Sequence, residues 1–375
     1  MTTSLFDLSP LLRLLGIGMV LAGLPLIWVL WRKRHAQGFG RLQALTLLTL
    51  FLTFDLVLFG SFTRLSDSGL GCPDWPGCYG NASPLGAQSQ ISDAQTAMPD
   101  GPVTHSKAWI EMVHRYLATG VGVLILTLAA MTWWLRRQSR EVSPWLPTLT
   151  LVWVCMQGAF GALTVTMKLF PAIVTLHLMG GIGLLVLLMA QAVRYDGAGT
   201  RPLPSPLRAG LWAGFVLLCL QIALGGWVST NYAVLACPDF PTCHGQWVPE
   251  MNWQGFTLWR ELGYTPTGEL LPFASLVSIH FVHRSAAWLV LAVLLWVGWR
   301  LRVQPGLAVA GHWLLGLCAL QFATGLSNVV LGWPLLAAVM HTGGAAAMAL
   351  TLTWALSVSR VDNSGPVPFS KKLAE

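Results

Sequence analysis

Nine long apolar segments constrain this chain more than any other feature. They cover residues 13–31, 41–62, 109–135, 145–167, 171–194, 207–230, 272–299, 307–331 and 334–358. A helix of about 20 apolar residues spans a bilayer, where each backbone polar group must be bonded internally. Only 10% of the 375 residues are charged, against roughly 25% in soluble domains. The sequence therefore predicts an all-α polytopic membrane protein.

The cationic residues indicate how the chain crosses the membrane. Most of the 22 lysines and arginines follow alternate apolar segments and so share one side: Arg32, Lys33, Arg34, Arg41, Arg136, Arg137, Arg140, Arg194, Arg201, Arg208, Arg300, Arg302, Arg360, Lys371 and Lys372. The positive-inside rule assigns this side, with a tail at 359–375, to the cytoplasm. The N-terminus and the long loops 63–108 and 231–271 are then outside. The net charge of +7 is thus explained by topology, and no nucleic acid partner is expected.

The first apolar segment is predicted to remain in the protein. Its positive charges follow the apolar run instead of preceding it, and no small-residue cleavage site is evident, unlike a secretory signal. An Arg-rich leader of the mitochondrial type is also missing, so we expect a bacterial cytoplasmic (inner) membrane.

The chain repeats itself with a period near 165 residues. The Cys72–Cys78 segment returns at Cys237–Cys243, and the later landmarks return in the same order: His114-Arg115 as His283-Arg284, Gln157 and Gly161 as Gln321 and Gly325, and His177 as His341. An even number of helices per repeat gives both halves one orientation. We predict two pseudo-symmetric four-helix bundles, at 41–195 and 207–358, with an extra N-terminal transmembrane helix and basic loop within 1–40.

Five histidines lie in the apolar segments or near their outer ends: His114, His177, His280, His283 and His341. An ionisable side chain inside a membrane is costly and usually functional. The pairs His114–His177 and His283–His341 lie at similar expected depths, roughly 8–16 Å below the outer boundary at 1.5 Å per residue, and could face each other across a flat macrocycle. The alternative is a hydrogen bond between helices without further function.

Heme is favoured over a bare metal ion as the ligand of these pairs. Imidazole suits several metals, but no carboxylate or thiolate occurs at matching depth in both halves. Glycines on the flanking helices give room for a ligand, although they also simply allow close helix packing. Arg115 and Arg284 follow the first histidine of each pair, where they could meet heme propionates or extend to lipid phosphates.

The pairs Cys72–Cys78 and Cys237–Cys243 lie in the loops assigned to the oxidising side, and local disulfides are the natural interpretation. A zinc site from the four thiolates is an alternative, but their spacing is wider than in structural zinc sites. Covalent heme attachment is disfavoured, because Phe240 stands where a C-x-x-C-H motif requires cysteine. The other cysteines, Cys155, Cys219 and Cys318, are expected to pack within helices.

The halves differ at one position near the first histidine. Glu111 precedes His114 by three residues and lies on the same helix face, about 5–6 Å away between Cβ atoms; its counterpart is His280. Only the first half therefore carries a carboxylate suited to proton transfer, unless Glu111 merely bonds a neighbouring helix. For His280 three roles stay open: a residue behind the ligand, a surface residue, or a competitor of His283. The segment Thr63–Gly71, with Arg64, could cover the first site.

These residues resemble the heme A synthases of cytochrome oxidase assembly over about 41–358. The resemblance is carried by T-R-L-S-D-S-G-L-G-C-P-D-W-P-G-C-Y-G at 63–80, E-M-V-H-R at 111–115, H-R at 283–284 and the helices of His177 and His341. It implies a b-type heme cofactor held by His283 and His341, and binding of the substrate, heme O, near His114 and His177. The C8 methyl of heme O would be oxidised to a formyl group through successive hydroxylations and loss of water. The extra helix at 13–31 departs from the family's eight-helix core.

The resemblance also implies roles for single residues. Glu111 matches the family's essential carboxylate, and Cys72–Cys78 its outward disulfide. Our hypothesis is that the C-terminal heme relays electrons from an unidentified donor, while Glu111 handles protons or positions an intermediate. Heme O synthase and cytochrome oxidase assembly factors are candidate partners, besides membrane lipid.

Two other classes of protein would fit part of this pattern. A diheme b-type electron-transfer subunit explains the four histidines equally well, but neither the single Glu111 nor the long loops. A transporter would fit the parallel repeat and the glycines, but needs a site at the membrane midplane, whereas these histidines cluster toward the outer side.

Overall fold

The computed structural model describes residues 9–36, 38–197 and 199–361, and within them the predicted all-α membrane class is confirmed. Nine helices in this part are long and apolar enough to cross a membrane. They are α1 (Ser9–Arg32), α2 (Gly38–Leu65), α4 (His105–Gln138), α5 (Trp145–Thr166), α6 (Pro171–Asp196), α7 (Ser205–Thr230), α8 (Phe273–Leu301), α9 (Ala308–Val330) and α10 (Leu335–Ser357). Lys371 and Lys372, placed in the tail by the sequence prediction, lie outside the described residues.

Short elements occupy the connections. The loop after α2 contains a 3₁₀ turn, η1 (Pro84–Ala87), and a short helix, α3 (Gln88–Ala97), and the loop after α7 contains η2 (Trp253–Phe256). At the opposite end of the molecule, β1 (Arg201–Leu203) pairs in parallel with β2 (Ser359–Val361). The first residues of the predicted tail therefore contact the linker between the two halves.

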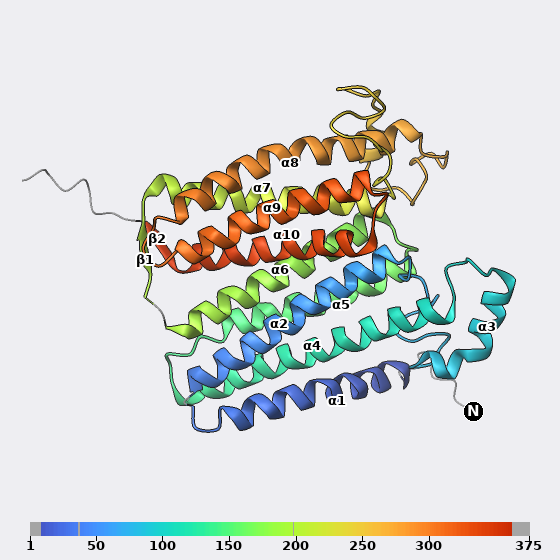
Figure 1. The fold of residues 1–375 in the computed structure, drawn as a ribbon. Coiled ribbons are helices and arrows are strands. Elements are labelled where there is room, and N and C mark those ends of the chain that lie inside the picture. The colour runs from blue at the N-terminus through green and yellow to red at the C-terminus, as the bar shows by residue number, and fades with distance from the viewer. Residues whose placement is uncertain (1–8, 37, 198, 362–375) are drawn as a thin grey trace, which may run out of the picture.

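The eight membrane-length helices described after α1 form two bundles that pack in the same way (Figure 1). In the first, α2 and α5 each contact α4 and α6; in the second, α7 and α9 each contact α8 and α10. Between the bundles, α6 packs on α10, α2 on α10 and α6 on α7. These contacts are symmetric if α2 corresponds to α7 and α6 to α10, as expected for a parallel repeat. The extra helix α1 lies beside α4, at the edge of the first bundle.

The packing suits a chain whose solvent is lipid. Leucines on the inner helix faces are fully buried, among them Leu42, Leu185 and Leu352. Many outer faces carry large exposed apolar side chains, such as Phe51 and Trp134, which would be costly in water but not in a bilayer. Helix hydroxyls bond the carbonyl four residues earlier, so few polar groups face the lipid unpaired.

Candidate functional site

One large cavity extends between the two bundles. Its volume is about 880 Å³, near the upper end of the roughly 300–1,000 Å³ typical of ligand pockets. All eight helices of the two bundles contribute to its wall. The lining includes all four repeat-related histidines: His114, His177, His283 and His341. The two predicted sites therefore share one continuous space.

The structure brings the histidines together in the predicted pairs. His114 on α4 and His177 on α6 lie close enough to interact electrostatically, and so do His283 on α8 and His341 on α10. Helix α4 begins at His105, four residues before the predicted apolar segment, because Thr104 caps it by accepting a hydrogen bond from the Lys107 N–H. His114 consequently lies deeper in its helix than expected from hydropathy.

A glycine faces each of the four imidazoles. A Cβ atom built on Gly60 would lie 2.9 Å from Nε2 of His114, and one on Gly225 would lie 3.0 Å from Cε1 of His283. On the other face of each bundle, Gly161 and Gly325 approach His177 and His341 in the same way, at 3.5 and 3.2 Å. Glycine thus leaves room for the rings of His114, His283 and His341, which a Cβ atom would crowd, whereas a Cβ at Gly161 would make an ordinary contact with His177.

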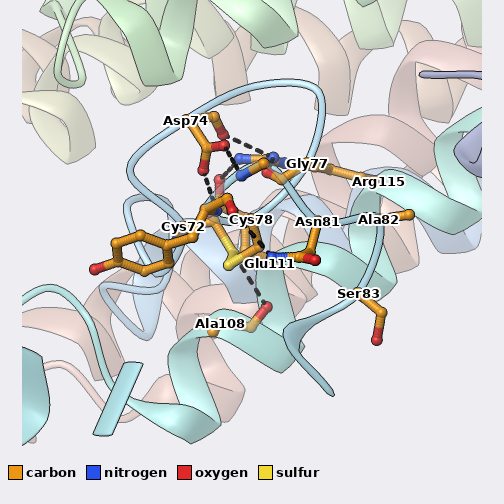
Figure 2. The surroundings of a disulfide bond; sticks show 12 residues. Cys72, Asp74, Gly77, Cys78, Asn81, Ala82, Ser83, Ala108, Glu111 and Arg115 are labelled. Carbon is orange, nitrogen blue, oxygen red and sulfur yellow. Dashed lines mark hydrogen bonds and ion pairs between the residues drawn. A yellow bond between two sulfur atoms is a disulfide. The ribbon is translucent and has the colours of Figure 1, made fainter. Parts of the chain in front are cut away.

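Glu111 binds the first cysteine loop, as Figure 2 shows. Its side chain is 4% exposed. One oxygen accepts a hydrogen bond from the Cys72 N–H at 2.8 Å, and the other pairs with the Arg115 guanidinium. Arg115 also donates to the carbonyl oxygens of Asp74, at 3.0 Å, and Gly77, at 2.5 Å. The carboxylate and the guanidinium together attach this loop to α4 at the cavity wall.

Both cysteine pairs form disulfides, Cys72–Cys78 and Cys237–Cys243. Their loops have the same internal structure: Asp74 accepts from the N–H groups of Tyr79 and Gly80, and Asp239 from those of His244 and Gly245. Gly80 and Gly245 both have positive φ, 71° and 73°, which glycine adopts without steric cost.

Hydrogen bonds within the second cysteine loop also stabilise the negative charge of the Asp239 carboxylate. The Thr242 hydroxyl and the N–H groups of Gly245 and His244 lower the pKa of the Asp239 carboxyl below its ordinary value.

The sequence profile of a family described as cytochrome oxidase assembly protein matches residues 43–353. The chain belongs to this family. A heme A synthase of Shewanella oneidensis is 40% identical over 81% of this chain and 92% of its own length. Heme A synthases of Halalkalibacterium halodurans and Methylobacterium nodulans are 26% and 29% identical, over 82% and 77% of this chain and 91% and 84% of their own lengths.

In this member of the cytochrome oxidase assembly proteins, His280 takes the place of Glu111 in the second half. Its side chain is 5% exposed, and its Nδ1 accepts a hydrogen bond from the Cys237 N–H at 3.3 Å. Of the three roles left open by the sequence, the structure excludes a surface position. His280 anchors the second cysteine loop as Glu111 anchors the first.

The arginines after the histidines, predicted to meet heme propionates or lipid phosphates, donate to the cysteine loops in the structure. Arg284 donates to the carbonyl oxygens of Asp239, at 2.7 Å, and Thr242, at 2.8 Å. Arg115 makes the equivalent contacts in the first loop, described above. Both arginines line the cavity, but their observed hydrogen bonds hold the cysteine loops.

Arg64 connects the two halves. From the end of α2 it donates to the Ser229 carbonyl at 2.8 Å and to the Tyr232 hydroxyl at 3.0 Å, and its guanidinium lies 4.2 Å from the Tyr232 ring centre. It also lines the cavity. The sequence predicted that its segment could cover the first site, but gave no sign of this link to the second half.

The donor set suits heme better than a bare ion. In the described part of the chain, no three histidine, cysteine, aspartate or glutamate side chains form a group able to hold a metal ion. Two imidazoles supply only two ligands, and a porphyrin supplies four more in its plane. Paired histidines in a mostly apolar cavity therefore fit iron that arrives already bound in a macrocycle.

Proposed function

We propose that this chain is a heme A synthase, which oxidises the C8 methyl of heme O to a formyl group and so makes heme A for cytochrome oxidase. One observation carries the proposal: a single cavity joins two histidine pairs, and only one of the pairs has a carboxylate beside it. Family membership and the names of the relatives above support the same activity.

The two pairs divide the work in this proposal. His283 and His341 bind a b-type heme cofactor in the C-terminal bundle, 207–358, and His114 and His177 bind heme O in the N-terminal bundle, 41–195. The bound cofactor supplies electron transfer, with electrons from a donor still to be identified. Glycines against all four rings and a mostly apolar wall suit the flat, apolar body of a porphyrin.

Glu111 is the proposed catalytic residue. Both of its oxygens have a partner, but an ionised carboxylate has about four acceptor sites, so it can still accept a proton from the cavity that it lines. Arg115 pairs with this carboxylate, and the disulfide loop attached to both shields the outer end of the site from water. Arg115 and Arg284 would contact heme propionates only through N–H groups that the loops leave free.

We place the chain in a bacterial inner membrane, with both cysteine loops outside and β1–β2 at the cytoplasmic end. The loop disulfides and the basic segments near β1 and β2 support this orientation. Heme O would come from heme O synthase, and heme A would pass to cytochrome oxidase assembly factors.

The test is to purify the full chain from a host that makes heme O, extract its hemes and identify them by chromatography and mass. Heme B together with heme O or heme A, with heme A lost in Glu111→Ala, is the expected result. Heme B alone at two per chain would instead indicate a diheme electron-transfer subunit, and no heme at all would refute both. The His283→Ala and His341→Ala variants should lack the b-type spectrum.

A further inference from the structure

The four imidazoles that line the cavity differ in the hydrogen-bonding partner of their Nδ1 atom. In the C-terminal bundle, Nδ1 of His341 lies 2.9 Å from the Thr324 hydroxyl, and Nδ1 of His283 lies 3.1 Å from the Gln221 amide. In the N-terminal bundle, Nδ1 of His177 is buried and has no side-chain partner in the described structure.

His114, the remaining imidazole, stacks on Phe59 at 6.3 Å between ring centres. No hydrogen bond to its ring is found among the described residues.

The repeat explains this difference residue by residue. Gly60 and Gly225 face the equivalent histidines His114 and His283, and this aligns α2 with α7. Four positions before these glycines, the first half has Leu56 and the second half has Gln221. By the same alignment of Gly161 with Gly325, Phe160 corresponds to Thr324.

Both hydrogen-bonding side chains therefore belong to the C-terminal half, and both counterparts are apolar. The main-chain carbonyls of Gln157 and Gln321 lie beside His177 and His341 in both halves, so they do not distinguish the sites.

The Thr324 contact supports one tautomer of His341. The Thr324 hydroxyl lies 2.7 Å from the Leu320 carbonyl, and when it donates its single hydrogen there it can only accept toward His341. Nδ1 of His341 must then carry the ring proton, which leaves Nε2 with a free lone pair. That is the state in which an imidazole binds iron.

The Gln221 contact holds His283 at two points. The amide nitrogen of Gln221 donates a hydrogen bond to the main-chain oxygen of His283 at 3.0 Å and lies 3.1 Å from Nδ1 of the ring. The hydrogen bond to the main-chain oxygen identifies this end of the amide as the nitrogen. One side chain therefore restrains both the backbone and the ring orientation of His283.

We propose that Gln221 and Thr324 are positioning residues that lock His283 and His341 for iron, so that the C-terminal site keeps its heme through purification and turnover. The N-terminal site, with Leu56 and Phe160 in these positions, holds its heme less firmly and can exchange substrate for product. The inference rests on the proposed function, since it concerns hemes bound by these pairs.

The test compares Gln221→Leu, which installs the residue of the other half, with Thr324→Val, which keeps the shape of threonine but removes its hydroxyl. Full-length protein carrying its b-type heme is mixed with excess apomyoglobin, and heme transfer is followed by absorbance. Loss of such a hydrogen bond behind a ligand typically weakens metal binding about 10- to 100-fold, and we expect transfer to be faster by a similar factor.

The midpoint potential gives a second readout that a merely structural role would not move. A hydrogen bond accepted from Nδ1–H makes imidazole a stronger electron donor, so Thr324→Val should shift the potential of the b-type heme to a more positive value. Thr324→Ser keeps the hydroxyl and should match the parent protein. Phe160→Leu, at the equivalent place in the first half, should leave the transfer rate of the b-type heme unchanged.

Parent-like transfer rates in both Gln221→Leu and Thr324→Val, with a parent-like potential in Thr324→Val, would overturn the inference. If Gln221→Leu does not accumulate, the Thr324→Val and Thr324→Ser pair decides alone. Failure of the proposed function looks different: the parent protein would then contain no b-type heme, or His283→Ala and His341→Ala would keep its spectrum.

Discussion

Replacing Glu111 by histidine or by alanine separates its role in holding the first cysteine loop from its proposed role in catalysis. Its carboxylate accepts the Cys72 N–H at 2.8 Å, and in the proposed function it also handles a proton of the reaction. The second half shows that the first role does not need a carboxylate, since His280 accepts the Cys237 N–H there. Glu111→His should therefore keep the loop attached and abolish conversion, whereas Glu111→Ala should lose both.

The size of the loop effect follows from the hydrogen bond. A bond to a charged group contributes about 1.5–3 kcal/mol, and a neutral one about 0.5–1.5 kcal/mol. At about 1.4 kcal/mol per factor of ten, Glu111→Ala should raise the population of the detached loop roughly 10- to 150-fold. Glu111→His should raise it by less than about 10-fold, because a neutral acceptor remains.

The assay is the rate at which a reductant opens the first disulfide. Cys72 and Cys78 are fully buried, so reduction requires the loop to detach, and the freed thiols can be labelled and counted by mass spectrometry. Heme A is measured in the same preparations. His280→Ala is the matched control, which should speed reduction only of Cys237–Cys243. Normal heme A production by Glu111→His would remove the chemical role, and an unchanged reduction rate in Glu111→Ala would refute the anchor.

Three further predictions concern packing and charge. Gly225→Ala should lower the b-type heme content, because the new Cβ would lie 3.0 Å from the His283 ring; Gly122→Ala, which meets nothing within 4 Å, should not, and equal heme content would refute the packing argument. Arg64→Lys should lower the free energy of unfolding by about 1 kcal/mol, measured by thermal melting, because lysine cannot reach its partners as a planar fork. Asp239 has a lowered pKa, so its stabilisation of the second loop is present above the ordinary aspartate pKa of about 3.9 and lost as the pH falls below it. Asp239→Asn should speed reduction of that loop's disulfide by a phosphine at pH 7, and the difference from the parent should vanish in acid.

Much of the fold followed from two patterns in the sequence. Apolar segments long enough for a bilayer gave the membrane helices, and this prediction is confirmed because hydropathy is a property of the chain itself. The internal repeat suggested two bundles and the pairing of His114 with His177 and of His283 with His341, and their roles as heme sites stay a prediction. The hydropathy pattern did not predict the polar first turn of α4, which begins at His105, because a helix with a capped N-terminus needs no apolar residues in its first turn.

Other features depend on contacts that no sequence window contains. The strand Ser359–Val361 pairs with Arg201–Leu203, more than 150 residues earlier, and Arg64 finds its partners in the other half. For Arg115 and Arg284 the sequence suggested heme propionates or lipid phosphates, which stay predictions. Their hydrogen bonds to loop carbonyls could not be foreseen, because every residue of a loop has a carbonyl group and no side-chain pattern marks the ones that are used. Gln221 could have been found, by asking which polar residues have an apolar counterpart in the repeat.

Under the proposed function, the comparison of the halves accounts for two heme sites that differ in how firmly they bind. The shared parts, a disulfide loop attached by an arginine and a glycine against each histidine, build a binding site twice. The differences are few and lie at the ligands: a carboxylate or an imidazole beside the loop, and hydrogen-bonding or apolar side chains behind the rings. A polar side chain behind each ring favours permanent binding, whereas exchange of substrate and product requires weaker retention. In the proposed function one heme is kept while the other is released, and the polar side chains Gln221 and Thr324 lie in the half without the carboxylate, where the heme is to be kept.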